Sequence, residues 1–286
     1  MGRCRLSFLD RVAACRVFDP SRYRPFRVDG AGVGLVAAGF AQTLRQFPDV
    51  FRVSDGAVDL ADGIDGFDAR TEAVDGVLRR LAGQGAITGW RDEPYPVARS
   101  HTHPPLFTME RAAVPLFGVR ACGVHMNGFV RDAGGVKMWI GRRSVDKPTG
   151  PGKLDQLVAG GQPAGISVGD TLIKECAEEA AIPAGLAGRA VPVGGVSYCT
   201  ERPEGLRRDV LFDFDLELPA DFRPANADGE ISDFYLWPME RVIETVRDTD
   251  DFKFNCALVV IDFLIRHGFI GPGDPEYVDL LGGLHG

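Results

Sequence analysis

Residues 160–182 read GGQPAGISVGDTLIKECAEEAAI and decide the interpretation of this sequence. Apolar residues recur at helical spacing after Gly169 and predict a helix over about residues 169–181. The expected apolar stripe consists of Leu172, Ile173, Cys176, Ala177 and Ala180. Glu175, Glu178 and Glu179 follow at i, i+3 and i+4 and fall on the opposite side of this helix.

These three glutamates are the first candidate for chemistry. Like charges within one helical turn repel each other by a few tenths of a kcal/mol per pair. A solvated helix face tolerates such a cluster, and for an isolated E-x-x-E-E that is the better interpretation. Here Gly160, Gly161 and Gly165 precede the helix and allow a sharp turn. A carbonyl of this turn would join the glutamates as an oxygen ligand of the kind that Mg²⁺ prefers.

With this spacing, the segment resembles the signature of the Nudix hydrolase family, G-x5-E-x7-R-E-U-x-E-E-x-G-U, in which U is aliphatic. Alignment from Gly160 matches Glu175, Glu178 and Glu179, whereas Ile166, Lys174 and Ala181 replace the signature Glu, Arg and Gly. The resemblance implies that the three glutamates bind Mg²⁺ or Mn²⁺, with the Gly160 carbonyl as a further ligand. We expect Lys174 to pair with Asp170, four residues upstream.

A wider resemblance extends from about Phe26 to Tyr277. Residues 139–161 (WIGRRSVDKPTGPGKLDQLVAGG) and 252–268 (FKFNCALVVIDFLIRHG) are similar to Nudix proteins related to thiamine pyrophosphokinase. This subgroup implies a hydrolase that converts thiamine diphosphate, or its oxidised and damaged analogues, to the monophosphate. The implied fold is α+β, with a Nudix α/β/α sandwich built around a mixed sheet and preceded by a smaller α+β domain.

The local patterns fit this organisation. A length of 286 residues favours two domains, and we place an N-terminal accessory domain at 1–110 and the Nudix domain at 111–286. Residues 51–60 predict a hairpin around Asp55-Gly56, and residues 122–131 and 136–143 predict a second one. Asp68 is the expected N-cap of a helix, and the proline-containing stretch 90–105 is expected to be a loop.

Basic residues near the signature are candidates for binding the diphosphate. Arg142, Arg143 and Lys147 precede it, and arginine suits bidentate contact with phosphate oxygens. Adjacent residues of a strand face opposite sides, so only one of the two arginines is expected to face the site. Surface charge at a strand end is the alternative interpretation.

Other residues complete the candidate site. Glu178 or Glu230 is the expected acceptor of the proton from the attacking water, since family members often place another acid near position 230. His125 and Asn127 share a strand face and are candidates for the substrate pocket, although a hydrogen-bonded histidine within a sheet is an equal alternative. Tyr198, at a strand end, is a candidate for contact with the organic part of the substrate.

Composition excludes several classes of protein. A net charge of -8 argues against a general nucleic-acid binder, and no apolar run has transmembrane length. Arg3, Arg5 and Asp10 interrupt the first residues, which argues against a secretory signal. The six scattered cysteines indicate neither a zinc site nor a disulfide framework, so we expect reduced thiols in the cytoplasm. The partner is a small-molecule diphosphate, and the oligomeric state, homodimer included, stays open.

Two rival functions remain. Isopentenyl-diphosphate isomerases share the Nudix fold but need a catalytic cysteine and an acid, and Cys122 or Cys199 would have to supply the thiol. Alternatively, Ile166 in place of the signature glutamate would mark a diphosphate-sensing domain without catalysis. Retention of the three helix glutamates favours hydrolysis over sensing.

Overall fold

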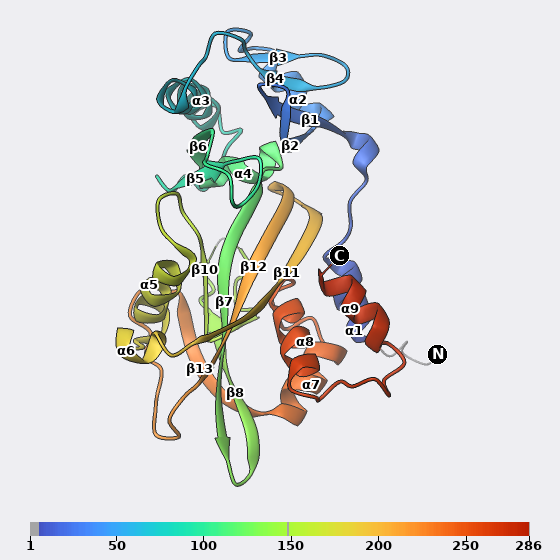
Figure 1. Ribbon diagram of the computed structural model, residues 1–286, viewed down its shortest axis with the longest axis vertical. Helices are drawn as coiled ribbons and strands as arrows, with labels where there is room; N and C mark the ends of the chain where they lie inside the picture. Colours follow the sequence, from blue (N-terminus) through green and yellow to red (C-terminus); the bar gives the residue numbers. More distant parts are fainter. Residues whose placement is uncertain (1–5, 148, 286) are drawn as a thin grey trace.

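The computed structural model describes residues 6–147 and 149–285. Arg3, Cys4 and Arg5 lie outside these residues. The described chain forms two parts, a small N-terminal unit above a larger one that contains a long sheet (Figure 1). No helix within the described chain is both long and apolar enough to span a membrane.

The large sheet carries the second unit. Its strands run in the order β11-β12-β7-β8-β13, with β10 added to β7 and β9 added to β8. Their bounds are β7 Arg120–Asp132, β8 Gly135–Arg143, β9 Leu154–Asp155, β10 Val158–Gly161, β11 Val191–Arg202, β12 Gly205–Glu217 and β13 Ile231–Pro238. β12 is parallel to β7, whereas the other pairs are antiparallel. The β7–β8 hairpin and the mixed sheet are as predicted.

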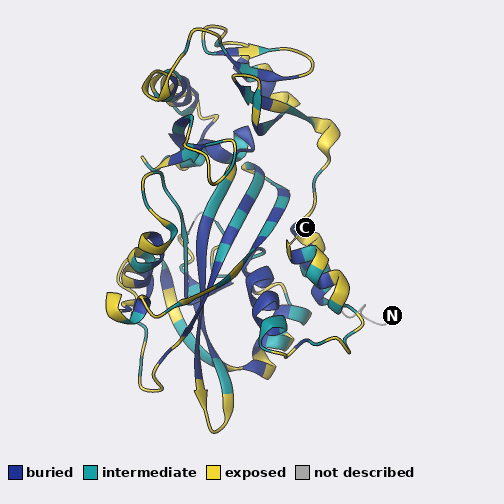
Figure 2. Ribbon diagram, in the orientation of Figure 1, coloured by how far each residue is buried: buried dark blue, intermediate teal, exposed yellow. Residues whose placement is uncertain are grey.

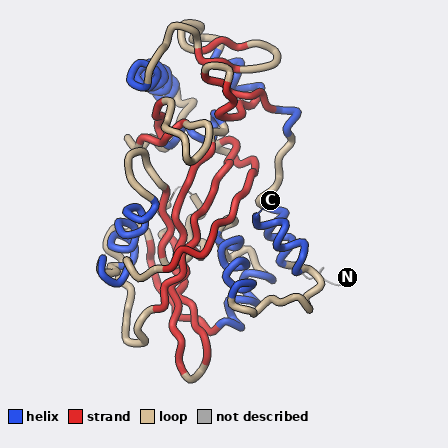
Figure 3. The backbone as a smooth tube through the Cα atoms, in the orientation of Figure 1, coloured by secondary structure: helices blue, strands red, loops and turns tan. Residues whose placement is uncertain are grey.

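Helices cover both faces of this sheet (Figure 3). One face packs against α5 and α6, and the other against a group of four helices that includes both ends of the described chain. Their bounds are α1 Phe8–Ala14, α5 Val168–Ala180, α6 Ala184–Ala187, α7 Met239–Asp248, α8 Cys256–Arg266 and α9 Tyr277–His285. In β8, Met138 and Ile140 join the α8 side, whereas Trp139 joins the α5 side, as strand alternation requires. This arrangement confirms the predicted α+β class.

The N-terminal unit has its own sheet, in the order β2-β1-β4-β3, and a two-stranded sheet of β5 and β6. Its elements are η1 Pro20–Arg22, β1 Tyr23–Val28, β2 Ala31–Ala37, α2 Ala38–Leu44, β3 Phe51–Val53, β4 Val58–Leu60, α3 Phe67–Gly83, β5 Pro94–Val97, β6 Phe107–Glu110, η2 Arg111–Ala113 and α4 Val114–Phe117. The hairpin of residues 51–60 is confirmed.

Two local predictions for this unit are wrong. The N-cap of α3 is Gly66, and Asp68 lies in the first turn instead, where its negative charge is favourable. The stretch 90–105 is not all loop, because Pro94–Val97 forms β5. Proline is compatible with this strand because β5 pairs on one side only, and an edge strand tolerates the missing N–H.

The hydrophobic cores cross the predicted division at residue 110. Phe8 and Val12 of α1 pack with the C-terminal helices, whereas Ala113, Phe117 and Val119 belong to the core of the N-terminal unit. The domain boundaries therefore remain a prediction. The burial pattern in Figure 2 shows a buried sheet between helices whose outer sides are exposed.

Candidate functional site

Helix α5 begins with a side-chain cap. Ser167 Oγ accepts a hydrogen bond from Asp170 N at 3.1 Å and donates to Asp170 Oδ2 at 2.6 Å. The predicted pairing of Lys174 with Asp170 is wrong, because the cap engages the Asp170 carboxylate. Lys174 Nζ instead donates to Glu178 Oε2 at 2.7 Å and to Glu175 Oε1 at 3.3 Å.

The other end of α5 explains one signature position. Ala181 ends the helix in the left-handed conformation, with φ 51° and ψ 36°. This conformation costs a residue with a Cβ about 1–2 kcal/mol. Glycine at this position, as in the family signature, would avoid that cost. Ala177, which we expected in the apolar stripe, is exposed.

The three signature glutamates do not all face the same space. Glu175 and Glu178 line a cleft of about 510 Å³, and Glu230 lines it from the loop before β13. Glu179 points into the interior, where Glu179 Oε2 accepts a hydrogen bond from Ala159 N at 2.7 Å. Burial raises the pKa of Glu179 well above its usual range and raises that of Glu175 as well. We call this space the mixed-charge cleft, since acidic and basic residues line it together.

Gly160 is needed at its position because the Glu175 carboxyl group occupies the place of its side chain. A Cβ on Gly160 would lie 2.2 Å from Glu175 Cδ. The absence of a side chain thus lets the first signature glutamate cross strand β10 into the cleft. This contact connects the glycine turn to α5, as expected from the sequence.

Basic residues surround the acids of the mixed-charge cleft. Arg143 and Lys147 line it, and Lys147 forms an ion pair with Glu230. Burial would raise the pKa of Glu230, but the hydrogen bond from Lys147 and its charge hold this pKa below its usual range. Arg142 points away, since its Nε donates to Tyr235 Oη at 3.2 Å and its Nη1 to Gly152 O at 2.9 Å. Arg143 is thus the arginine of this pair that reaches the cleft.

A smaller inner pocket of about 110 Å³ continues the cleft. Both are lined by Gly160, Gly161, Arg111, Arg207 and Lys253, among other residues. Tyr95 and Arg111 come from the N-terminal unit, and a Cβ on Gly161 would lie 1.8 Å from Tyr95 Oη. The inner pocket therefore lies between the two units of the chain.

Sequence reasoning missed most of these lining residues. Nothing in the local sequence marks Tyr95, Arg111 or Arg207, because only the packing of the two units brings them to β10. Lys253 was detectable as part of the FKFNC phrase, but without a role.

His125, Asn127 and Tyr198 occupy different environments. His125 lines the inner pocket, and His125 Nδ1 lies 2.7 Å from Gln156 Oε1. Asn127 Nδ2 donates to Asp215 Oδ1 at 3.2 Å, and Tyr198 Oη donates to Asp209 Oδ2 at 2.5 Å. Neither Asn127 nor Tyr198 belongs to the described residues that line the cleft or the inner pocket. The predicted contacts of Asn127 and Tyr198 with the substrate stay predictions, and each side chain donates to a carboxylate in the structure.

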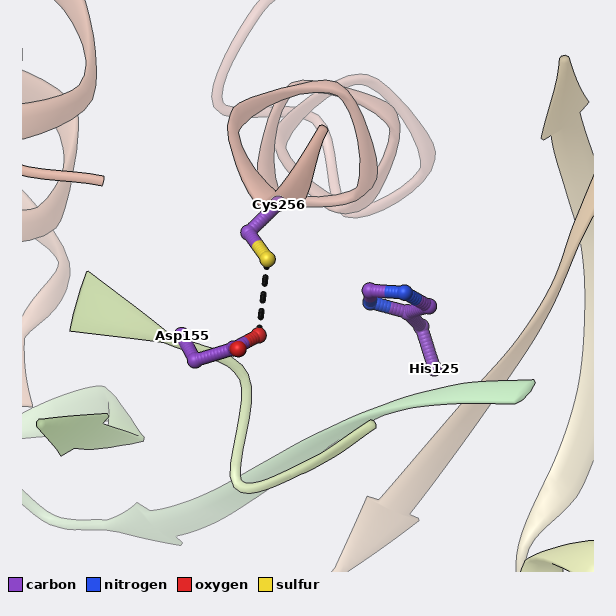
Figure 4. Close-up of side chains that lie close together, drawn as sticks. All are labelled: His125, Asp155 and Cys256. Atoms are coloured by element: carbon purple, nitrogen blue, oxygen red, sulfur yellow. Dashed lines mark hydrogen bonds between the residues drawn. The ribbon is translucent and has the colours of Figure 1, made fainter. Parts of the chain in front are cut away.

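His125, which lines the inner pocket, lies close to Asp155 and Cys256, which do not line it (Figure 4). Their potential ligand atoms lie within 4.8 Å of one another, close enough to hold a metal ion. However, Asp155 Oδ2 already accepts from Arg143 Nη1 at 2.9 Å and lies 3.8 Å from Lys253 Nζ. Cys256 Sγ donates to Asp155 Oδ1 at 2.7 Å. These cations and the protonated thiol oppose a metal, so we interpret the group as a buried hub that holds Arg143 and Lys253.

The pKa values of the hub agree with this interpretation. Burial opposes ionisation of Asp155, but the charges of Lys253 and Arg143 bring its pKa to about 2. Burial lowers the pKa of His125 to about 4 and raises that of Cys256 well above its usual range. Asp155 is thus ionised at neutral pH between a neutral imidazole and a neutral thiol.

The donor set of the mixed-charge cleft fits a hard divalent cation. Glu175, Glu178 and Glu230 offer carboxylate oxygens toward one space, which is what Mg²⁺ and Mn²⁺ bind in proteins. Neither cysteine considered for an isomerase lines this cleft within the described chain. Cys122 lines the inner pocket, where burial raises the pKa of its thiol to about 11.

Known proteins resemble the chain over most of its length. Residues 7–121 match a family described as "Domain of unknown function (DUF4743)". "Nudix hydrolase 20, chloroplastic" of Arabidopsis thaliana is 47% identical over 266 residues, which cover 90% of this chain and 71% of the relative. "Nudix hydrolase 24, chloroplastic" of the same plant is 47% identical over 277 residues, covering 96% and 76%. A solved MutT/nudix family protein from Enterococcus faecalis is 15% identical with a TM-score of 0.43, covering 57% of this chain and 68% of that one.

Proposed function

The chain belongs to the Nudix hydrolase family, and on that premise we propose that it removes one phosphate from thiamine diphosphate or an oxidised analogue. Nudix hydrolases act on diphosphate-containing small molecules and generally use divalent metal ions. The observation that carries the proposal is the mixed-charge cleft, where Glu175, Glu178 and Glu230 meet cationic side chains. The thiamine part is supported by the resemblance of residues 139–161 and 252–268 to the thiamine pyrophosphokinase-related subgroup.

Glu175 and Glu178 are the proposed residues that hold Mg²⁺ or Mn²⁺, with the carbonyl of Gly160 as a further ligand. When bound, the metal supplies positive charge to the diphosphate oxygens and lowers the pKa of a bound water. Glu179 has a supporting part, because its hydrogen bond from Ala159 N fixes the residue before Gly160. Glu179 thus helps the pairing of β10 with β7 to hold Gly160 in place.

Cationic side chains bind the diphosphate in this proposal. Arg143, held by Asp155, and Lys253 both line the cleft, and they are the proposed contacts of the phosphate oxygens. Glu230 accepts a proton from the attacking water, since it lines the cleft together with Glu175 and Glu178 and is ionised at neutral pH. The water oxygen bonds to the terminal phosphorus, the bridging P–O bond breaks, and the monophosphate and inorganic phosphate leave.

A substrate panel with a single variant tests the function. Thiamine diphosphate, its oxidised analogues, ADP-ribose and isopentenyl diphosphate are incubated with Mg²⁺ or Mn²⁺ and followed by ³¹P and ¹H NMR. We expect phosphate release from a thiamine diphosphate form and a loss of about 100-fold or more in kcat for Glu178→Gln. Glu240→Gln, an exposed glutamate of α7, is the matched control.

Other outcomes would overturn the proposal. Full turnover by Glu178→Gln would remove this glutamate from the site. A shifted double bond in isopentenyl diphosphate would indicate an isomerase, and tight binding without product would indicate a sensor. The names of both plant relatives include "chloroplastic", so the cytoplasmic location stays a prediction. The oligomeric state stays a prediction as well.

A further inference from the structure

The N-terminal unit meets one end of the large sheet (Figure 1). A second cavity is lined by residues of both parts. Its volume is about 440 Å³, and we call it the junction cavity. It is open to solvent on one side and is lined by β2, by the loop of residues 98–105, by the first residues of β7, and by the turn of residues 162–166 that precedes α5. No described residue lines both this cavity and the mixed-charge cleft.

The charged residues that line the junction cavity are all basic. Among the described residues, its lining includes Arg99, Arg120, Arg208 and two histidines, but no Asp or Glu. The whole chain, by contrast, has 40 acidic and 32 basic residues. A cavity without acids in an acidic protein therefore concentrates positive charge at one place, which attracts anions.

Two of these arginines face each other across paired strands. Arg208 and Arg120 are Cα partners in the parallel ladder of β12 and β7, and like charges directly opposite destabilise a sheet. Burial lowers the pKa of Arg208, and the charge of Arg120 lowers it further. Arg208 Nη1 donates to Gly118 O at 3.0 Å, which holds the guanidinium in place. In the described part of the chain, neither arginine has a carboxylate partner in an ion pair.

The neighbouring residue on β12 provides an internal reference. Arg207 faces the opposite side of the strand, toward the mixed-charge cleft, and pairs with Asp209 at 2.6 Å. On this strand, the charge of Arg207 is thus compensated by Asp209, whereas Arg208 has no carboxylate partner among the described residues. Arg208 is half-buried, whereas Arg99 and Arg120 are exposed. A bound anion would therefore give the half-buried guanidinium of Arg208 a negative partner that no described carboxylate supplies.

We propose that the junction cavity binds a small anionic molecule whose phosphate or carboxylate group contacts Arg120 and Arg208. Arg99 adds a third positive charge from the loop. This loop is held against the sheet by His101, whose ring packs on Phe212 with a centroid distance of 5.0 Å. Guanidinium groups match the oxygens of both kinds of anion with two parallel hydrogen bonds. The bound molecule would also contact Gly165 and Ile166, and thus the turn that leads into the glutamate helix.

Thermal unfolding of the full chain tests this site with three salts of equal ionic strength. Sodium phosphate, sodium malonate and sodium chloride are compared in EDTA, so that no metal in the mixed-charge cleft captures the phosphate. We expect phosphate, malonate or both to raise Tm above the chloride value, and to do so more in the wild type than in Arg208→Gln, because a ligand stabilises the state that binds it. Exclusion of the salt from the surface would instead raise Tm equally in both proteins. Phosphate alone would identify a phosphate site, and malonate alone a carboxylate site. Equal Tm values in all three salts would overturn the proposal.

Variants then locate the anion. Arg208→Gln should raise the dissociation constant of the stabilising anion by about 10-fold or more, measured by calorimetry, and raise Tm slightly in chloride. Arg207→Gln and the exposed Arg189→Gln should keep the anion effect. If Arg207→Gln abolishes it and Arg208→Gln keeps it, the anion binds in the mixed-charge cleft and the proposal is wrong.

Discussion

The mixed-charge cleft and the junction cavity lie on either side of the same glycine turn but compensate charge in different ways. In the cleft, the hub of Asp155 holds Arg143 and Lys253, and Lys147 pairs with Glu230. In the junction cavity, no acid lines the space beside Arg99, Arg120 and Arg208 in the described structure. Acids and cations together suit a metal-bound diphosphate, whereas cations alone suit an anion without a metal. In the cleft, the protein's own acids thus compensate the cations. In the junction cavity, the proposed anion would supply the compensating charge.

The largest effect on stability is expected when a cation near the cleft loses its acidic partner, as in the junction cavity. Asp155→Asn removes the buried acid that holds Arg143, which leaves a buried cation without its partner. We expect the free energy of unfolding in urea to fall by about 3–5 kcal/mol. The exposed Asp221→Asn is the control. A loss below about 1 kcal/mol would mean that the hub does not compensate Arg143.

The pH dependence of stability tests the same hub through His125. The pKa of His125 is about 4 in the folded chain and about 6.5 when unfolded. As the pH falls below about 6.5, the unfolded chain takes up this proton first, so stability decreases until the pH reaches about 4. Above about 6.5 the contribution is constant.

Urea unfolding of the wild type and of His125→Gln across this range measures the effect. The wild type should lose up to about 1.4 kcal/mol per pH unit more than the variant. Parallel pH profiles for the two proteins would show that His125 is not buried in its neutral form.

An effect of intermediate size is expected from a substitution that adds one carbon at the edge of the cleft. Gly160→Ala puts a Cβ where the Glu175 carboxyl group lies. Because the new Cβ would meet a side chain and not the backbone, Glu175 can shift away. We therefore expect little change in stability but a rise of about 10-fold in the Mg²⁺ concentration for half-maximal hydrolysis. Gly39→Ala, whose Cβ would meet nothing within 4 Å, is the control. Unchanged Mg²⁺ dependence would remove Glu175 from the metal ligands.

The sequence predicted those structural features of the two sites that depend on the spacing of residues close together in the chain. The glycine turn, helix α5 and the β7–β8 hairpin follow from periodicity and turn residues that lie close together in the chain. Spacing also placed Glu175 and Glu178 on one face, but it did not show that Glu179 points inward. The three residues span about 100° of the helix, and the packing of β10 against α5 decides which one is buried.

The rest of both sites depends on contacts between distant segments. Asp155 meets Arg143, Cys256 and Lys253 only after β9 has paired with β8 and α8 has packed beneath the sheet. Tyr95 and Arg111 reach the inner pocket because the N-terminal unit lies on the end of the large sheet. The pairing of Arg120 with Arg208 requires the register of β7 and β12. No local pattern encodes such a register, so the junction cavity was not predictable from the sequence.

The smallest effect on stability is expected when an acid is added beside the arginines of the junction cavity, as in the cleft. Arg120→Glu places a carboxylate opposite Arg208, so that a like-charged pair becomes an oppositely charged one. We expect the free energy of unfolding to increase by about 0.2–1 kcal/mol and this gain to shrink in 1 M salt, where the Debye length is about 3 Å. Arg120→Gln should give part of the gain, since it removes the repulsion without adding an attraction. If Arg120→Glu is no more stable than the wild type at low salt, the two guanidinium groups do not repel each other, and the cavity has no unfavourable charge for a ligand to relieve.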